Sequence, residues 1–339
     1  MHGGKFAQAA ADLRRLEQLH PADPAPPFFQ ALADLWHIFY VGSDTELLRS
    51  LNANADRAVS KANWILMGRT ELPAEVHFWR GMSRSVNIAG RMAARALGSE
   101  GRQLDFRALV TGLSILSDAH AAELDFDQAL AGNARLTDAR VMLILFQECR
   151  GADKTQCIAD LWRRADDVQW VGTEIKYILL NLSYNRRSAD DLRARAVPLA
   201  IELHGRYPTN GLFHLAMAKV SYEVGDPATA EATSHEILSG VNASAFGPEA
   251  HYLLGMIAGD DSDWRKALAQ FQEIIAASPR HPSYLLPWAL VRAAQCEEAI
   301  GSRDASLKYA RAVLASEAAE GAAQTAARRI IARFGQAHR

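Results

Sequence analysis

The sequence predicts an all-α fold in which antiparallel helix pairs stack into one continuous solenoid. No segment alternates apolar and polar residues convincingly, so almost no sheet is expected. The composition is 49% hydrophobic, rich in Ala and Leu and with only 12 Pro, as close-packed helices require. A chain of 339 residues also exceeds the usual size of one globular core, a limit that stacked repeats avoid.

The clearest repeated pattern lies near the C-terminal end. It consists of Leu254-Gly255, Ala267 twelve residues after the Gly, Phe271 four later and Pro279 eight later. The Gly suits a first helix at a point where a Cβ would collide with the second helix, and Ala267 suits the reciprocal position. Phe271 follows one turn later on the same face. Pro279 ends the second helix because it lacks an N–H and disfavours α conformation in the residue before it.

This spacing resembles the tetratricopeptide repeat (TPR). The resemblance implies a right-handed α-α superhelix whose first helices line a concave groove. The wider layout is similar to bacterial TPR proteins with a Pro-bearing turn before an aromatic helix and a later segment like 206–210, Arg-Tyr-Pro-Thr-Asn. Such proteins are commonly scaffolds or adaptors, which implies a protein or peptide partner and no enzymatic activity.

The N-terminus looks like the second half of a repeat. Its register residues are Gly4, Ala9, Leu13, Leu16 and Pro21. Either a shortened unit caps the array, or residues upstream are missing. We expect a cytoplasmic protein as written, or a periplasmic or envelope protein if a signal sequence precedes Met1. An uncapped half-repeat would expose apolar surface through which two copies could form a homo-oligomer.

The elements of residues 1–168 follow the repeat pattern only loosely. The expected helices run from about 28 to 40 and from about 44 to 67, then one opened by Pro73 and containing Phe78, Gly81 and Ala93, and one from Asp138, as N-cap, to Cys149. We therefore treat residues 1–168 as a divergent N-terminal half.

Residues 169–339 follow the pattern regularly. Gly225 and Gly301 mark turns between helices. The expected packing residues are Ala230 and Ile237 after Gly225, and Ser306, Ala310 and Val313 after Gly301. In the repeat before Gly225 they are Ala196, Ala200 and Leu203. A last helix, about 317 to 334, carries Arg328, Arg329 and Arg333 on one side and fits a solvated cap.

The composition argues against a nucleic-acid partner and against a membrane-spanning segment. Lys and Arg total 37 against 39 Asp and Glu, with no basic run, so a nucleic-acid partner is not expected. The longest apolar run, 141–146, is too short to cross a membrane. The three cysteines, Cys149, Cys157 and Cys296, form no CxxC pair and are expected to be buried packing residues.

No catalytic, cofactor-binding or metal-binding residues are predicted. HExxH, GxSxG, Walker and GxGxxG motifs are absent from the sequence. The histidines considered as metal ligands fall on different expected helices: His77, His204, His214, His235 and His251. The acidic stretch 260–263 lacks the Gly and distal Glu of a calcium loop and is better explained as a turn and N-cap before Trp264.

The candidate binding site is the concave groove, formed mainly by residues 177–300. The candidate groove residues are Asn181, Asn185, Leu212, Leu215, Lys219, Glu249, Tyr252, Met256, Trp288, Val291 and Gln295. Their mixture of aromatic, Met and polar side chains suits an apolar or amphipathic peptide or helix. For any one of them, packing against a neighbouring helix is an equally good interpretation.

Two questions of function stay open at this point. A carboxylate clamp for C-terminal tails is not expected, because Ala216, Glu249 and Leu253 occupy positions where Asn, Lys and Arg would be needed. The alternative to a scaffold is a regulatory or sensor fragment of a larger signalling or transcription protein, whose solenoid binds a small ligand or an effector domain.

Overall fold

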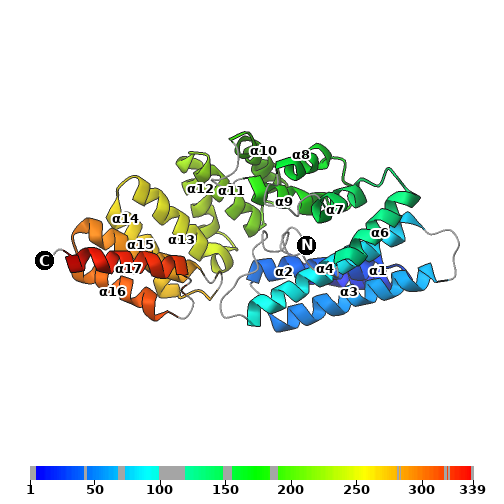
Figure 1. Ribbon diagram of the computed structural model, residues 1–339, viewed down its shortest axis with the longest axis horizontal. Coiled ribbons are helices and arrows are strands. Elements are labelled where there is room, and N and C mark those ends of the chain that lie inside the picture. Colours follow the sequence, from blue (N-terminus) through cyan, green and yellow to red (C-terminus); the bar gives the residue numbers. More distant parts are fainter. Residues whose placement is uncertain are drawn as a thin grey trace. The chain divides into compact units, whose positions relative to one another are not determined.

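The computed structural model describes residues 5–41, 44–67, 73–98, 119–147, 155–183, 190–280, 282, 284–316, 319 and 321–336. These residues form sixteen α-helices and no strand. The predicted all-α solenoid of consecutive antiparallel helix pairs is therefore confirmed (Figure 1).

The chain forms two compact units, which meet in sequence between Leu203 and His204. The first contains α1 Phe6–Leu19, α2 Ala25–Val41, α3 Thr45–Leu66, α4 Ala74–Gly98, α6 Ala119–Gly132, α7 Thr137–Gln147, α8 Thr155–Arg164, α9 Gly172–Ser183 and most of α10 Asp190–Arg206. The second contains α11 Gly211–Glu223, α12 Pro227–Ser239, α13 Ala243–Asp260, α14 Trp264–Ala277, α15 Leu285–Ile300, α16 Arg303–Ala315 and α17 Gly321–Gln336. The division expected at 168/169 concerned the regularity of the repeats and stays a prediction.

Helices of the second unit pack in two rows. Each helix contacts the next one along the chain, and α11, α13, α15 and α17 also contact one another in succession. The described parts of α12, α14 and α16 make at most marginal contacts with one another. Helices on the inner side of a curved array lie closer together than those on the outer side, so we call α11, α13, α15 and α17 the inner row.

The predicted register is confirmed by the contact between α13 and α14. A Cβ added to Gly255 would lie 2.7 Å from Cε1 and Cζ of Phe271, so only Gly allows the ring this close. Ala267 and Phe271 are both buried in one cluster with Ile274 and Leu285. The small residue and the ring are therefore two halves of one packing contact.

The turns of the second unit use the residues expected for them. Gly225 and Gly301 have φ angles of +86° and +93°, a region that L side chains rarely adopt. The carboxylates of Asp226 and Asp263 accept hydrogen bonds from the first-turn N–H groups of α12 and α14. The 260–263 segment is thus a turn and an N-cap, as predicted.

Ala267→Leu is expected to lower the free energy of unfolding by about 1–3 kcal/mol, since added methylenes have no space in a close-packed seam. Ala267 is fully buried, whereas Ala269 on the same helix is exposed. Ala269→Leu is therefore the matched control and should change stability little. Urea denaturation followed by circular dichroism measures both, and equal midpoints for the two variants would show that the register is wrong.

An aromatic cluster forms the core of the first unit. Trp79 of α4 lies with its ring centroid 5.3 Å from Phe28 of α2 and 4.9 Å from Trp170, which precedes α9. Phe78 lies 6.1 Å from Phe126 of α6, and a Cβ on Gly81 would lie 2.8 Å from that second ring. Gly81 is thus a point of close approach between α4 and α6; the side chain of Ala93 lies outside the described residues.

Asp138 does not have its predicted role. Helix α7 begins at Thr137, so Asp138 lies inside its first turn and is not the N-cap. Its buried carboxylate accepts hydrogen bonds from the backbone N–H groups of Gln169 at 2.9 Å, Trp170 at 2.8 Å and Val171 at 3.1 Å. It therefore satisfies the orphan donors ahead of α9, a helix distant in sequence.

A buried ion cluster joins α4 to α6. Asp125 is 2% exposed. Its Oδ1 lies 2.6 Å from Arg80 Nη2 and 2.8 Å from Arg80 Nε, and Arg84 Nη1 lies 3.2 Å from Oδ2 without hydrogen-bond geometry. Burial, followed by the charge of Arg80, lowers the pKa of nearby His77, so this ring is neutral at pH 7. The single carboxylate thus forms ion pairs with two partly buried guanidinium groups and offsets one of their two charges.

The cysteines differ from one another. Cys157 is buried and disulfide-bonded, so the expectation that it is only a packing residue is wrong. Cys296 is free and buried, as expected; Cys149 lies outside the described residues. None of the helices described is long and apolar enough to span a membrane.

Candidate functional site

The candidate groove residues fall into three groups. Asn181 lies on α9 in the first unit, where its side chain donates to the carbonyl of Tyr177 at 2.8 Å, and Asn185 lies outside the described residues. In the second unit, three are buried: Leu212, Leu215 and Val291. Six are half-buried on the inner row: Lys219, Glu249, Tyr252, Met256, Trp288 and Gln295.

The three buried residues pack between helices. Val291 is fully enclosed and belongs to the cluster that joins α15 to α16 and α17. Leu212 and Leu215 retain 8% and 4% exposure. These side chains therefore serve the helix packing, which the sequence had left as an equal alternative to ligand contact.

A small pocket lies at the half-buried residues of α13 and α15. It has a volume of about 270 Å³. Two candidate groove residues, Met256 and Gln295, share its wall with Gly255, Gly259, Asp260, Trp264, Phe271, Arg292 and Cys296. The volume suits one or two side chains of a ligand and is below the usual range for a whole small molecule.

Arg292 lines this pocket and has one hydrogen-bond donor without a partner among the described residues. Its Nη1 donates to Gln295 Oε1 at 3.1 Å. Its Nε is buried and has no hydrogen-bond partner among the described residues. A buried donor left unpaired costs about 1–3 kcal/mol.

Other groups around the pocket limit its chemistry. Burial raises the pKa of the Cys296 thiol to about 11, so it is protonated at neutral pH and not a nucleophile. Asp260 accepts a hydrogen bond from the hydroxyl of Tyr222 at 2.6 Å. The pocket therefore combines an apolar wall with one cationic group, Arg292, and one carboxylate, Asp260.

A charge pair continues the inner row beyond the pocket. Lys219 Nζ on α11 lies 3.2 Å from Glu249 Oε1 on α13. Tyr252 lies one turn from Glu249 on the pocket side, and its ring meets Phe271 edge-on at 5.7 Å between centroids. Half-buried polar and aromatic groups thus follow one another across neighbouring helices.

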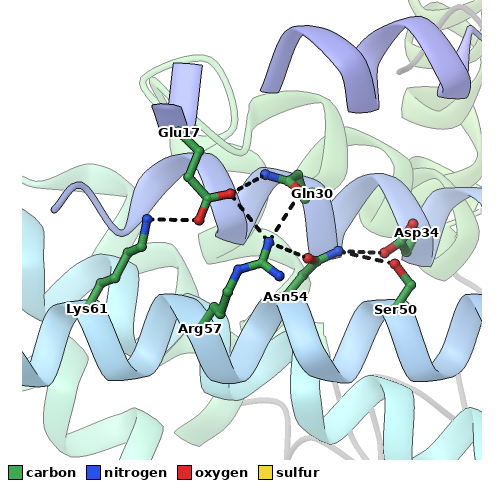
Figure 2. A network of polar contacts seen from close by, with 7 residues as sticks. All are labelled: Glu17, Gln30, Asp34, Ser50, Asn54, Arg57 and Lys61. Atoms are coloured by element: carbon green, nitrogen blue, oxygen red, sulfur yellow. Dashed lines mark hydrogen bonds and ion pairs between the residues drawn. The ribbon is translucent and has the colours of Figure 1, made fainter. Parts of the chain in front are cut away.

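A second, larger pocket lies in the first unit between α1, α2 and α3. Its volume is about 550 Å³, within the range of small-molecule sites. Nine of its eleven lining residues have polar or charged side chains: the lining residues are Ala10, Arg14, Glu17, Gln18, Pro21, Gln30, Asp34, Ser50, Asn54, Arg57 and Lys61. Figure 2 shows the network in which Lys61, Arg57, Asn54 and Ser50 follow one another along α3.

Glu17 is the centre of one end of this network. Its carboxylate accepts from Lys61 Nζ at 2.8 Å, Gln30 Nε2 at 2.9 Å and Arg57 Nη2 at 3.3 Å. Burial by itself would raise the pKa of Glu17, but the hydrogen bonds from Lys61 and Gln30 and the two positive charges outweigh it and lower the pKa. Glu17 is therefore a carboxylate at neutral pH.

Asp34 forms the other end. Its Oδ2 accepts from Asn54 Nδ2 at 2.9 Å, and it is also hydrogen-bonded to Ser50. Burial raises the pKa of Asp34 because these bonds and the charge of His37 compensate only in part. Arg57 Nη2 donates to Asn54 Oδ1 at 2.8 Å and so links the two ends.

The sequence contained a weak signal for each missed residue. Arg292 is the one charged residue in the apolar run 285–294. Ser50, Asn54, Arg57 and Lys61 recur at helical spacing beside the buried stripe of α3, but such a polar stripe is usually a solvated face. In the part of the chain that the structure describes, no group of three His, Cys, Asp or Glu could hold a metal ion.

No protein-family model matches the chain. No curated protein matches it either. Among solved structures, the human IFIT1 dimer with PPP-AAAA is similar over 92% of this chain and 68% of that one, at 12% identity and a TM-score of 0.40. Yeast Tom70 is similar over 98% and 86%, at 14% identity and a TM-score of 0.34. Likenesses this distant say nothing about ligands.

The packing itself decides the type of repeat. Close approach of Gly255 to Phe271, turns at positive-φ glycines and a closely spaced inner row occur together in one unit. The fold is therefore an all-α helical array with TPR-like packing of its helix pairs. Its repeats place half-buried side chains of successive first helices next to one another.

Proposed function

We propose that the second unit is a non-enzymatic protein-interaction module that binds a peptide or a helix along its inner row. The finer role of scaffold or adaptor follows from such binding, since a repeat array can hold a partner without changing it. The inner row offers a charge pair, aromatic rings, a Met and a small pocket in succession.

The pocket between α13 and α15 is the observation that carries this proposal. Its apolar wall includes Met256, whose thioether adapts to varied side chains. The unpaired Nε of Arg292 favours a ligand acceptor beside the anchor, such as a backbone carbonyl. A peptide can supply both an apolar side chain for the wall of the pocket and a backbone carbonyl as the acceptor for Arg292.

Peptide selection and direct binding test the proposal. Peptides selected from a random display library against the purified chain are measured by fluorescence polarisation. Met256→Asp is expected to weaken binding about tenfold or more, because it puts a charge against the apolar anchor with no partner, a cost of at least about 1.4 kcal/mol.

The matched control is Leu314→Asp, the same kind of change at an exposed position on the outer helix α16. It should leave the affinity unchanged. Selected peptides that bind both variants as well as the native chain would place the ligand away from the inner row, and a library that yields no binder would count against peptide recognition as such.

A further inference from the structure

The pocket between α1, α2 and α3 has hydrogen-bond donors that the protein does not use. Arg14 lines it and makes no hydrogen bond or ion pair with any described residue. Arg57 uses only Nη2, leaving Nε and Nη1 without protein partners among those residues. Lys61 Nζ makes one bond of the three it can donate.

The charges at this end do not balance. Arg14, Arg57 and Lys61 carry three positive charges, and Glu17 is the one carboxylate among them. The guanidinium of Arg14, whose N–H groups make no bond to a described residue, can present two parallel N–H groups to the two oxygens of a carboxylate or phosphate. The end near α1 is therefore built to accept an anionic group.

At the opposite end of the pocket, Asp34 favours a hydrogen-bond donor instead of an anionic group. It is a partly buried carboxylate that needs donors, and the protein supplies Asn54 and Ser50. Each carboxylate oxygen can accept more than one hydrogen bond, so a further donor would be accommodated. A hydroxyl or ammonium group on a ligand would fit here.

We infer that this pocket binds a small organic anion that carries a hydroxyl or ammonium group at its other end. The anionic group pairs with Arg14 and Arg57, and the donor reaches Asp34 past the Asn54 side chain. Gln30 and Asn54 line the pocket, are 6% and 7% exposed, and are held in place by hydrogen bonds to Glu17 and Asp34. The site lies in the first unit and is independent of peptide binding.

Calorimetric titration with two probes tests the inference. L-Glutamate combines carboxylates with an ammonium, and glycerol 3-phosphate combines a phosphate with hydroxyls; glycerol is the neutral control. At least one anionic probe should bind in a salt-sensitive way, and glycerol should not. Binding of only one probe would identify the anionic group as carboxylate or phosphate.

Arg14→Gln is the decisive variant, because Arg14 is exposed and makes no contact whose loss would weaken the fold. Its dissociation constant should rise about tenfold, the loss of one charge-assisted hydrogen bond. Arg15→Gln removes the same charge from the next, exposed residue outside the pocket and should bind as the native chain does. Failure of both probes to bind, or equal loss in both variants, would overturn the inference.

Asp34→Asn examines the other end of the pocket. It removes a charge that burial disfavours but keeps an oxygen for Asn54 and Ser50, so the fold should be at least as stable. Weaker probe binding at unchanged or higher melting temperature would confirm a ligand role for Asp34. Unchanged affinity would show that the donor group of the ligand does not reach it.

Discussion

Asp125→Ala is expected to lower the stability of the first unit by about 3–5 kcal/mol, the usual cost of removing one partner from a buried ion pair. The carboxylate is 2% exposed and forms ion pairs with the guanidinium groups of Arg80 and Arg84. Without it, two partly buried positive charges lose their counter-charge. Urea denaturation followed by circular dichroism should show a lower midpoint for the transition of this unit.

Two further variants separate charge from shape. Asp127→Ala lies on the same helix at an exposed position and should change stability little. Asp125→Asn keeps one oxygen for Arg80 but not the charge, so its loss should be intermediate. If Asp125→Ala and Asp127→Ala unfold at the same urea concentration, the cluster does not stabilise the fold as described.

Phe271→Ala is expected to cost the second unit about 3–5 kcal/mol, as large-to-small core substitutions of Phe do. The ring is 2% exposed, fills the space above Gly255 and meets Tyr252 edge-on. Its loss leaves a cavity at the junction of α13, α14 and α15. Hydrogen exchange should speed up in these helices, while Glu273→Ala, at an exposed position of α14, should leave it unchanged.

A double-mutant cycle checks the contact behind this effect. Gly255→Ala places a Cβ about where the ring now lies, so it should destabilise the native chain. In a Phe271→Leu background the same change should cost less, because the flexible side chain can move away. Equal costs in both backgrounds would mean that Gly255 and Phe271 do not touch.

The repeat register was predictable because its contacts are local. Gly255 and Phe271 lie on consecutive helices joined by a tight turn, so the spacing along the chain translates directly into proximity. Turns at Gly225 and Gly301 follow in the same way from residues that tolerate positive φ. Helical periodicity likewise predicted the groove positions on α11, α13 and α15. It did not predict which of these side chains are buried between helices.

Contacts between distant helices could not be predicted in this way. Asp138 was a convincing N-cap from its own neighbourhood, yet its carboxylate bonds Trp170, 32 residues later. Arg80 and Asp125 are 45 residues apart, and either could have been a solvated surface charge. Local sequence does not predict which helices become neighbours. The role of a polar side chain depends on the group with which it forms a hydrogen bond or ion pair.

The positions of most helices and the packing of Gly255 against Phe271 could be read from the sequence, because these depend on steric size and spacing over one or two turns. The places where polar groups meet depend on how distant helices pack, which spacing along the chain does not show. Glu17 and Lys61, 44 residues apart, join at a pocket whose unused donors come from α1 and α3. A hydrogen-bonding side chain acquires its chemistry from neighbours that folding brings to it, so the candidate sites emerge only once the helices are packed.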